Sequence, residues 1–154
     1  MRKINEYIIE KLKVNSKSKV NNYTYNYYPK NRKELEKIVN KLIDERGNDA
    51  DLNDIDTSEV DDMGFIFVNS EFNGDISHWN TSNVKDMMNM FIYSKFNGDI
   101  SQWDVSKVEN MTDMFYGSEF SGDIENWKVN PKCDMTMMFA HSPLEKNPPS
   151  WYKK

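Results

Sequence analysis

The sequence predicts an α/β repeat solenoid, in which short parallel strands and short helical turns stack behind an N-terminal helical cap. Two observations carry this prediction: a strict 24-residue period, and an amphipathic helix just before it. The tryptophans keep the period throughout, at Trp79, Trp103, Trp127 and Trp151. Because one repeat cannot bury its own apolar side, equivalent residues of adjacent repeats are expected to stack into one core.

Other large residues keep the same 24-residue step and form further columns. The unit reads F-x-G-D-I-x-x-W-x-[VT]-x-x-V-x-x-M-x-x-M-F-x-x-S, and about four copies cover residues 49–144, with a stub ending at Trp151. The columns of large apolar residues include Met63, Met87, Met111 and Met135; Phe67, Phe91, Phe115 and Phe139; and Phe72, Phe96 and Phe120. These columns are the predicted core.

The spacing inside one unit predicts its local structure. The segment I-x-x-W-x-[VT] has the spacing of a leucine-rich-repeat strand, so Trp79 and Thr81 should point inward, as should Trp103 and Val105. The following V-x-x-M-x-x-M-F is spaced by three and four, which predicts one or two helical turns on the opposite side. Phe-Asn-Gly-Asp supplies a turn between units.

The unit also resembles a known family. Residues 96–111 read F-N-G-D-I-S-Q-W-D-V-S-K-V-E-N-M, which is similar to the BspA-like leucine-rich-repeat family of bacterial surface lipoproteins and of phage or mobile-element proteins. The resemblance implies a binding solenoid without catalytic residues. The start of this sequence shows neither a signal peptide nor a lipidation cysteine, which favours an intracellular or phage-encoded member.

The segment before the repeats predicts a cap. Residues 31–46 form an amphipathic helix with Leu35, Ile38, Val39 and Leu42 on one face. Asn31 with Glu34 resembles a capping box, and Gly47 should end the helix. The alternating Tyr23, Tyr25 and Tyr27 suggest a short strand beside it. We therefore divide the chain into a basic arm (1–21), a strand with a capping helix (22–47) and the solenoid (48–154).

Charge divides at the same boundary. Residues 1–47 hold 12 Lys or Arg and 6 Asp or Glu, a balance of +6, whereas residues 48–154 hold 8 and 19, a balance of −11. The acidic repeats should repel nucleic acid and favour a protein partner. No apolar run approaches the ~18 residues of a membrane helix, so we expect a cytoplasmic protein, or one in the host cytoplasm or virion if phage-encoded.

The polar residues that alternate with the inward positions are the candidate partner-binding residues, because solenoids commonly bind through their strand face. The alternative is that this face is simply solvated. The candidates are Asp54, Asp56, Ser58, His78, Asn80, Ser82, Gln102, Asp104, Ser106, Asn126, Lys128 and Asn130.

A second column is acidic: Asp51, Asp75, Asp99 and Asp123. Stacked ~5 Å apart, these carboxylates would repel by ~1 kcal/mol per neighbour, so something must compensate. Either calcium binds there, or each Asp caps backbone N–H groups of its own turn, which we favour. We expect no other metal and no cofactor, with His78 and His141 at the surface and Cys133 a buried structural thiol.

Three functions remain open at this stage. The first is a non-enzymatic protein-interaction module that binds through its acidic, polar strand face. The second is a structural or packaged phage-particle component docked by its N-terminal arm, and the third is a phage inhibitor of a host nuclease or defence protein through its acidic surface. No catalytic motif appears, so an enzyme is not expected, and the oligomeric state stays open.

Overall fold

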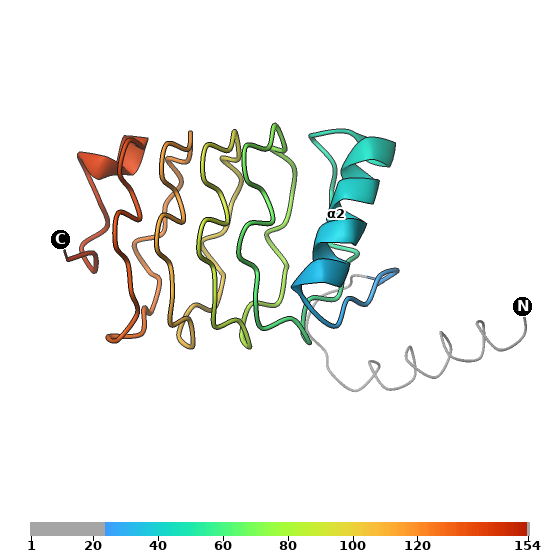
Figure 1. Cartoon of the computed structure of the whole chain (residues 1–154), viewed down its shortest axis with the longest axis horizontal. Coiled ribbons are helices and arrows are strands. Elements are labelled where there is room, and N and C mark those ends of the chain that lie inside the picture. Colours follow the sequence, from blue (N-terminus) through green and yellow to red (C-terminus); the bar gives the residue numbers. More distant parts are fainter. Residues whose placement is uncertain (1–23, 154) are drawn as a thin grey trace, which may run out of the picture.

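The computed structural model describes residues 24–153. The predicted arm, residues 1–21, therefore lies outside the described residues. Figure 1 shows a single row of stacked coils, with helix α2 (Arg32–Arg46) against the N-terminal end and the short 3-10 helix η1 (Pro143–Glu145) at the other. We number the coils 1 to 4, starting at residues 48, 72, 96 and 120. The repeat architecture and its period are thus confirmed.

The predicted α/β class is wrong. Among residues 24–153 the regular elements are α2 and η1, and β-pairing is limited to isolated parallel bridges. Bridges such as Asp62–Asp86 and Asp86–Asn110 join residues 24 positions apart, so the coils are in parallel register without continuous strands. The stack is built from turns.

The segment predicted as a strand is a tight turn. The N–H of Trp79 donates to the carbonyl of Ile76 (3.1 Å), and that of Trp103 to Ile100 (3.1 Å). Such bonds three residues back are those of a turn and not of an extended strand. The predicted inward positions are still right, because Trp79 and Thr81 are buried while Asn80 between them is exposed.

The segment predicted as helical turns is also a run of turns. We call residues 61–70, 85–94, 109–118 and 133–142 the turn ladder. Met90 donates to the carbonyl of Met87 (3.2 Å), again three residues back, and Asn89 and Tyr93 have φ of 56° and 53°, which interrupts any helix. The N–H groups in between donate across to the next coil: Met87 to Asn110 (2.9 Å), Asn89 to Thr112 (3.0 Å) and Phe91 to Met114 (2.9 Å).

The tryptophan column ties each coil to the one before it. The indole N–H of Trp79 donates to the carbonyl of Leu52 (3.0 Å), and the same bond recurs from Trp103 to Ile76 (3.2 Å) and from Trp127 to Ile100 (3.0 Å). A buried indole N–H needs an acceptor, and the coil spacing supplies one each time. This explains why the column is tryptophan.

Phenylalanine rings stack along the same axis. The centroids of Phe67 and Phe91 are 5.4 Å apart, as are those of Phe91 and Phe115, and Phe115 lies 5.8 Å from Phe139. All four rings are essentially inaccessible to solvent. The predicted Phe core column is therefore confirmed.

Helix α2 closes the N-terminal end of this core. Leu35, Val39 and Leu42 are fully buried against it. The side chain of Asn31 accepts from the Glu34 N–H (3.0 Å), as predicted. The Glu34 carboxylate accepts from the backbone N–H of Lys30 (2.9 Å) and from the side-chain amide of Asn31 (3.5 Å), in place of the backbone N–H of Asn31 that a capping box would use. The helix ends at Arg46, and Gly47 follows with φ of 91°, a value that favours glycine.

The short segment before α2 pairs with coil 1. Tyr27 forms a parallel bridge with Ile55, and the N–H of Asp56 donates to the carbonyl of Tyr27 (2.8 Å). The strand predicted beside the helix is therefore wrong for residues 24–31, because a single bridge joins Tyr27 to coil 1 and no strand forms; Tyr23 lies outside the described residues.

The close approach of coils at the glycine column gives a testable stability difference. A Cβ on Gly74 would lie 2.0 Å from the backbone oxygen of Ala50, whereas one on Gly122 would first meet the ring of Phe120, at 2.8 Å. A ring can shift more readily than a backbone, so Gly74→Ala should destabilise by about 1–3 kcal/mol and Gly122→Ala by less. Urea unfolding of both variants measures this; equal losses would contradict the close approach.

Candidate interaction surfaces

Every predicted partner-binding residue is at least partly exposed. We call this set the polar face. The exposed members are His78, Asn80, Gln102, Asp104, Ser106, Asn126 and Lys128, and the half-buried members are Asp54, Asp56, Ser58, Ser82 and Asn130. The stack brings them together as equivalent positions of successive coils. Their binding role stays a prediction.

Short polar turns hold the polar face in place. The Asp104 carboxylate accepts the N–H (3.0 Å) and the hydroxyl (2.6 Å) of Ser106, and Asn80 accepts the same two bonds from Ser82, at 3.1 and 2.7 Å. The bonds from Ser106 hold the pKa of Asp104 below its usual value. Part of the hydrogen-bonding capacity of this face is therefore used internally.

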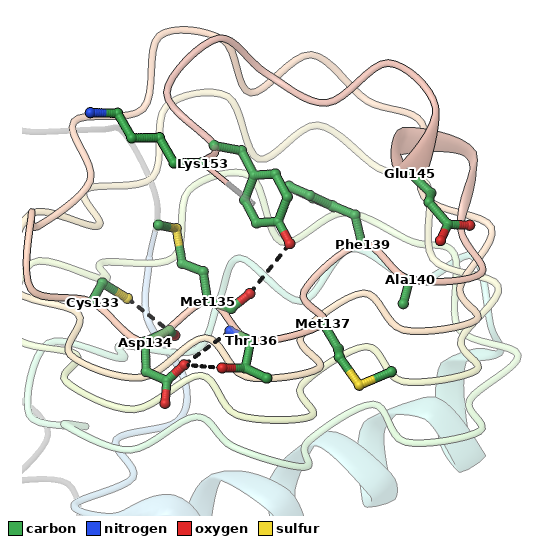
Figure 2. Close-up of a pocket in the computed structure, with 10 residues that line it drawn as sticks. Cys133, Asp134, Met135, Thr136, Met137, Phe139, Ala140, Glu145 and Lys153 are labelled. Carbon is green, nitrogen blue, oxygen red and sulfur yellow. Dashed lines mark hydrogen bonds between the residues drawn. The ribbon is translucent and has the colours of Figure 1, made fainter.

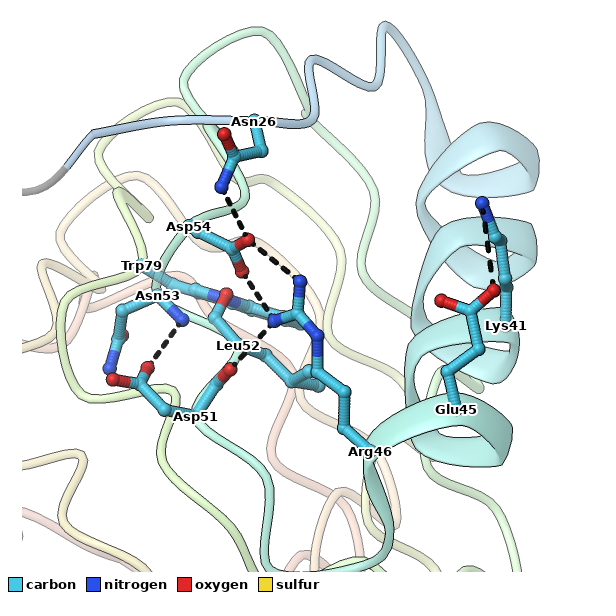
Figure 3. A network of polar contacts seen from close by, with 9 residues as sticks. All are labelled: Asn26, Lys41, Glu45, Arg46, Asp51, Leu52, Asn53, Asp54 and Trp79. Atoms are coloured by element: carbon cyan, nitrogen blue, oxygen red, sulfur yellow. Dashed lines mark hydrogen bonds and ion pairs between the residues drawn. The ribbon is translucent and has the colours of Figure 1, made fainter.

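Asp54 has a structural role. Both of its carboxylate oxygens accept from the guanidinium of Arg46 (2.9 Å each), and Asn26 donates to one of them at 2.9 Å (Figure 3). Burial alone would raise the pKa of Asp54, but the bonds from Arg46 and Asn26 hold it below its usual value. Because Arg46 is the last residue of α2 and also donates to the Asp51 carbonyl (3.1 Å), this cluster clamps the cap to coil 1.

The acidic column consists of turn-capping residues, as favoured above. The Asp75 carboxylate accepts from the N–H of Ser77 (2.9 Å), and the Asp99 carboxylate from Ser101 (2.9 Å); Asp51 and Asp123 make the same bond. The amide and hydroxyl of Ser101 lower the pKa of Asp99 and outweigh the opposing charge of Asp75. Among residues 24–153 no three His, Cys, Asp or Glu side chains gather closely enough to hold a metal ion.

A second surface was missed by the sequence analysis. It lies on the outer positions of the turn ladder, and four of its large apolar side chains are exposed: Phe65 by 45%, Val68 by 36%, Tyr93 by 55% and Met137 by 51%. We call it the aromatic face. Its members are Phe65, Val68, Met88, Ile92, Tyr93, Tyr116, Met137 and His141.

Ring contacts join the aromatic face across coils. Tyr93 meets Tyr116 edge to face at 5.5 Å, and Tyr116 meets His141 at 5.0 Å. Tyr93 lies so close over Gly117 that a Cβ there would come within 2.4 Å of its ring. One sequence signal for this face was available, because Met88 and Met137 lie outside the core columns. The other members do not recur as the same residue type every 24 positions, so the repeat pattern does not reveal them.

The remaining single residues are structural or exposed. Cys133 is buried (8% exposed), and its N–H donates to Asn130 (2.9 Å) just as Val84 donates to Thr81 (2.9 Å), so the thiol takes the place of the valine side chain. Burial raises the pKa of this thiol to about 11, so the reactive thiolate is disfavoured, and the predicted buried position is confirmed. His78 and His141 are exposed, as predicted.

The turn-capping carboxylates predict acid sensitivity. Hydrogen bonds from Ser101, Ser106 and Thr136 hold the pKa values of Asp99, Asp104 and Asp134 below the ordinary 3.8. A folded-state pKa below the unfolded value contributes stability that is present above the unfolded pKa and lost as pH falls through the folded one. The free energy of unfolding should therefore fall from about pH 5 downwards.

Urea unfolding between pH 7 and pH 2.5 measures this loss. The control is the triple Asp→Asn variant at 99, 104 and 134, since an amide oxygen accepts the same bonds without titrating, as Asn80 and Asn110 already do at equivalent positions. The variant should show a shallower pH dependence. An unchanged slope would mean that these carboxylates do not carry the effect.

Comparison with known proteins places the chain in a family without an assigned activity. No curated protein and no solved structure matches it. No helix within residues 24–153 is long and apolar enough to cross a membrane. One family model matches residues 33–151, from the first turn of α2 to Trp151, so cap and coils are recognised together. The chain therefore belongs to the family described as "Mycoplasma protein of unknown function, DUF285".

Proposed function

We propose that the chain is a non-enzymatic protein-interaction module whose partner packs on the aromatic face. The observation that carries this proposal is the exposure of Phe65, Val68, Tyr93 and Met137, by 36–55%, in the turn-ladder segments of coils 1, 2 and 4. Exposed apolar side chains gathered on one surface mark interaction sites, and tyrosine is enriched at the residues that dominate binding energy.

The backbone beneath this face supports the proposal. The turn-ladder segments of coils 1 to 3 donate bonds to the next coil and bonds within themselves, as at Tyr93, whose N–H donates to Tyr116 (2.9 Å), and Ser94, which donates to Phe91 (3.1 Å). A surface held in this way loses little conformational freedom on binding, which leaves more of the interaction energy as affinity.

The polar face is the second contact surface that we propose, and it ranks lower. Its most N-terminal carboxylate, Asp54, is already paired with Arg46, and Asp104 already accepts two bonds from Ser106. The resemblance of residues 96–111 to BspA-like leucine-rich repeats also supports binding over catalysis for the array as a whole.

Affinity capture with two matched variants tests the proposal. The full chain is immobilised, incubated with mycoplasma lysate and compared by quantitative mass spectrometry with Tyr93→Ser/Tyr116→Ser and with Asp56→Lys/Asp104→Lys. We expect the tyrosine variant to lose at least tenfold of a specific protein that the aspartate variant retains. Thermal melting checks that both variants stay folded.

The opposite result identifies the other surface. If only the aspartate variant loses the captured protein, the partner binds the polar face and the aromatic face is not the site. If no protein is enriched over a control resin, the proposal of an interaction module is wrong.

A further inference from the structure

The C-terminal end of the stack contains a hollow of about 540 Å³ (Figure 2). Its floor is the turn ladder of coil 4, with Met135, Met137 and Phe139, and its rim includes Glu145 and Lys153. The hollow lies where the turn ladder of a fifth coil would stack. It is distinct from the polar face and shares only Met137 with the aromatic face.

At this end of the stack, the core is covered on the side of the tryptophan column and partly open on the side of the turn ladder. Trp151 continues the tryptophan column, because its indole N–H donates to the Ile124 carbonyl (2.9 Å) and its ring lies 6.0 Å from Trp127. On the turn-ladder side, Met135 is only half-buried, whereas its equivalents Met63, Met87 and Met111 are fully buried. Tyr152 covers part of the gap, meeting Phe139 edge to face at 4.9 Å.

The C-terminal edge of the coil 4 turn ladder, which borders the hollow, carries a row of backbone N–H donors. In coil 3 the N–H groups of Met111, Asp113 and Phe115 donate to the carbonyls of coil 4, at 2.7, 3.0 and 2.9 Å. The equivalent N–H groups of coil 4 belong to Met135, Met137 and Phe139, and no acceptor for them lies among residues 24–153. The row stops at His141, whose N–H donates to the Glu145 carboxylate (3.1 Å).

We propose that this edge binds a segment of a partner protein, which adds to the stack as one further turn-ladder segment. The segment presents backbone carbonyls at every second residue to the N–H groups of Met135, Met137 and Phe139. Its apolar side chains, spaced by three and four like the repeats' own M-x-x-M-F, fill the hollow over Met135 and Phe139. Backbone bonds give the affinity and the hollow gives the specificity, as in the addition of a strand to a sheet edge.

A second copy of this chain is not the occupant. Two copies meeting by this edge would place donors against donors between Met135 and Phe139. The complementary carbonyl-bearing edge is that of coil 1, and there α2 covers the end of the core, held by the Arg46–Asp54 pair and by Arg32 against Asp62 (3.3 Å). Because one edge presents donors and α2 covers the other, we infer that the occupant is a segment of a different protein, which supplies the backbone carbonyl acceptors.

Amide hydrogen exchange, followed residue by residue by NMR, tests the proposal directly. The probe is a synthetic peptide of residues 109–118, which carries the acceptor carbonyls of a coil, added to the full chain at about 1 mM so that even millimolar affinity is seen. In the free protein the amides of Met135, Met137 and Phe139 should exchange fast, whereas those of Met111, Asp113 and Phe115 are protected. Peptide should slow the first set at least tenfold and leave the second unchanged.

A fusion of the peptide to the chain excludes weak affinity as the reason for a lack of amide protection. The same ten residues, joined after Lys154 by a flexible Gly-Ser linker, are held at millimolar effective concentration. Unchanged exchange of the three amides in both the mixture and the fusion would overturn the proposal. Protection of these amides in the free protein would also overturn it, because the row would then already be occupied.

Matched variants locate the bound peptide. Met135→Lys places a charge in the hollow and at the edge, which should weaken peptide binding at least tenfold. Asn83→Lys adds the same charge at an exposed position of coil 2, away from the hollow and outside both faces, where the equivalent residue of coil 3 is already Lys107, and it should leave peptide affinity within twofold. Equal losses in the two variants would show that the peptide binds elsewhere.

Discussion

The structure depends on one interaction, the backbone hydrogen bond from every second N–H of a turn ladder to the next coil. Met87, Asn89 and Phe91 donate forward, while the N–H of Met90, lying between them, bonds back within its own turn. All these backbone donors are satisfied without a helix or a continuous sheet. The arrangement works only if successive coils have the same length, which is why the period is kept at 24 residues.

The side-chain columns follow from that spacing. Once backbones are held in register, equal positions of adjacent coils face each other, so Phe91 stacks between Phe67 and Phe115. The Trp103 indole finds the Ile76 carbonyl in the same place that Trp127 finds Ile100. A column therefore favours one residue type, and the ends of the stack become the places where the pattern must be closed, by α2 at one end and only in part by Trp151 and Tyr152 at the other.

The period, the core columns and the cap at 31–46 were predictable from sequence, because each rests on repeated burial of large side chains. The secondary structure was not. Apolar residues three and four positions apart fit a helix and a chain of turns equally well. The positive φ of Asn89 and Tyr93 decides for turns, and no residue pattern in the sequence indicates it. The aromatic face was missed for a related reason: Phe65, Tyr93 and Met137 do not repeat, because outer positions have no stacking partner that selects them.

The turn ladder can be observed directly by NMR, through scalar couplings across hydrogen bonds between the amide nitrogen of a donor and the carbonyl carbon of its acceptor. The account predicts couplings from Asn89 to Thr112 and from Phe91 to Met114, together with a coupling from Met90 to Met87 inside the turn. Couplings that join each residue of 85–92 to the residue four positions earlier would instead show a helix, and would contradict the account.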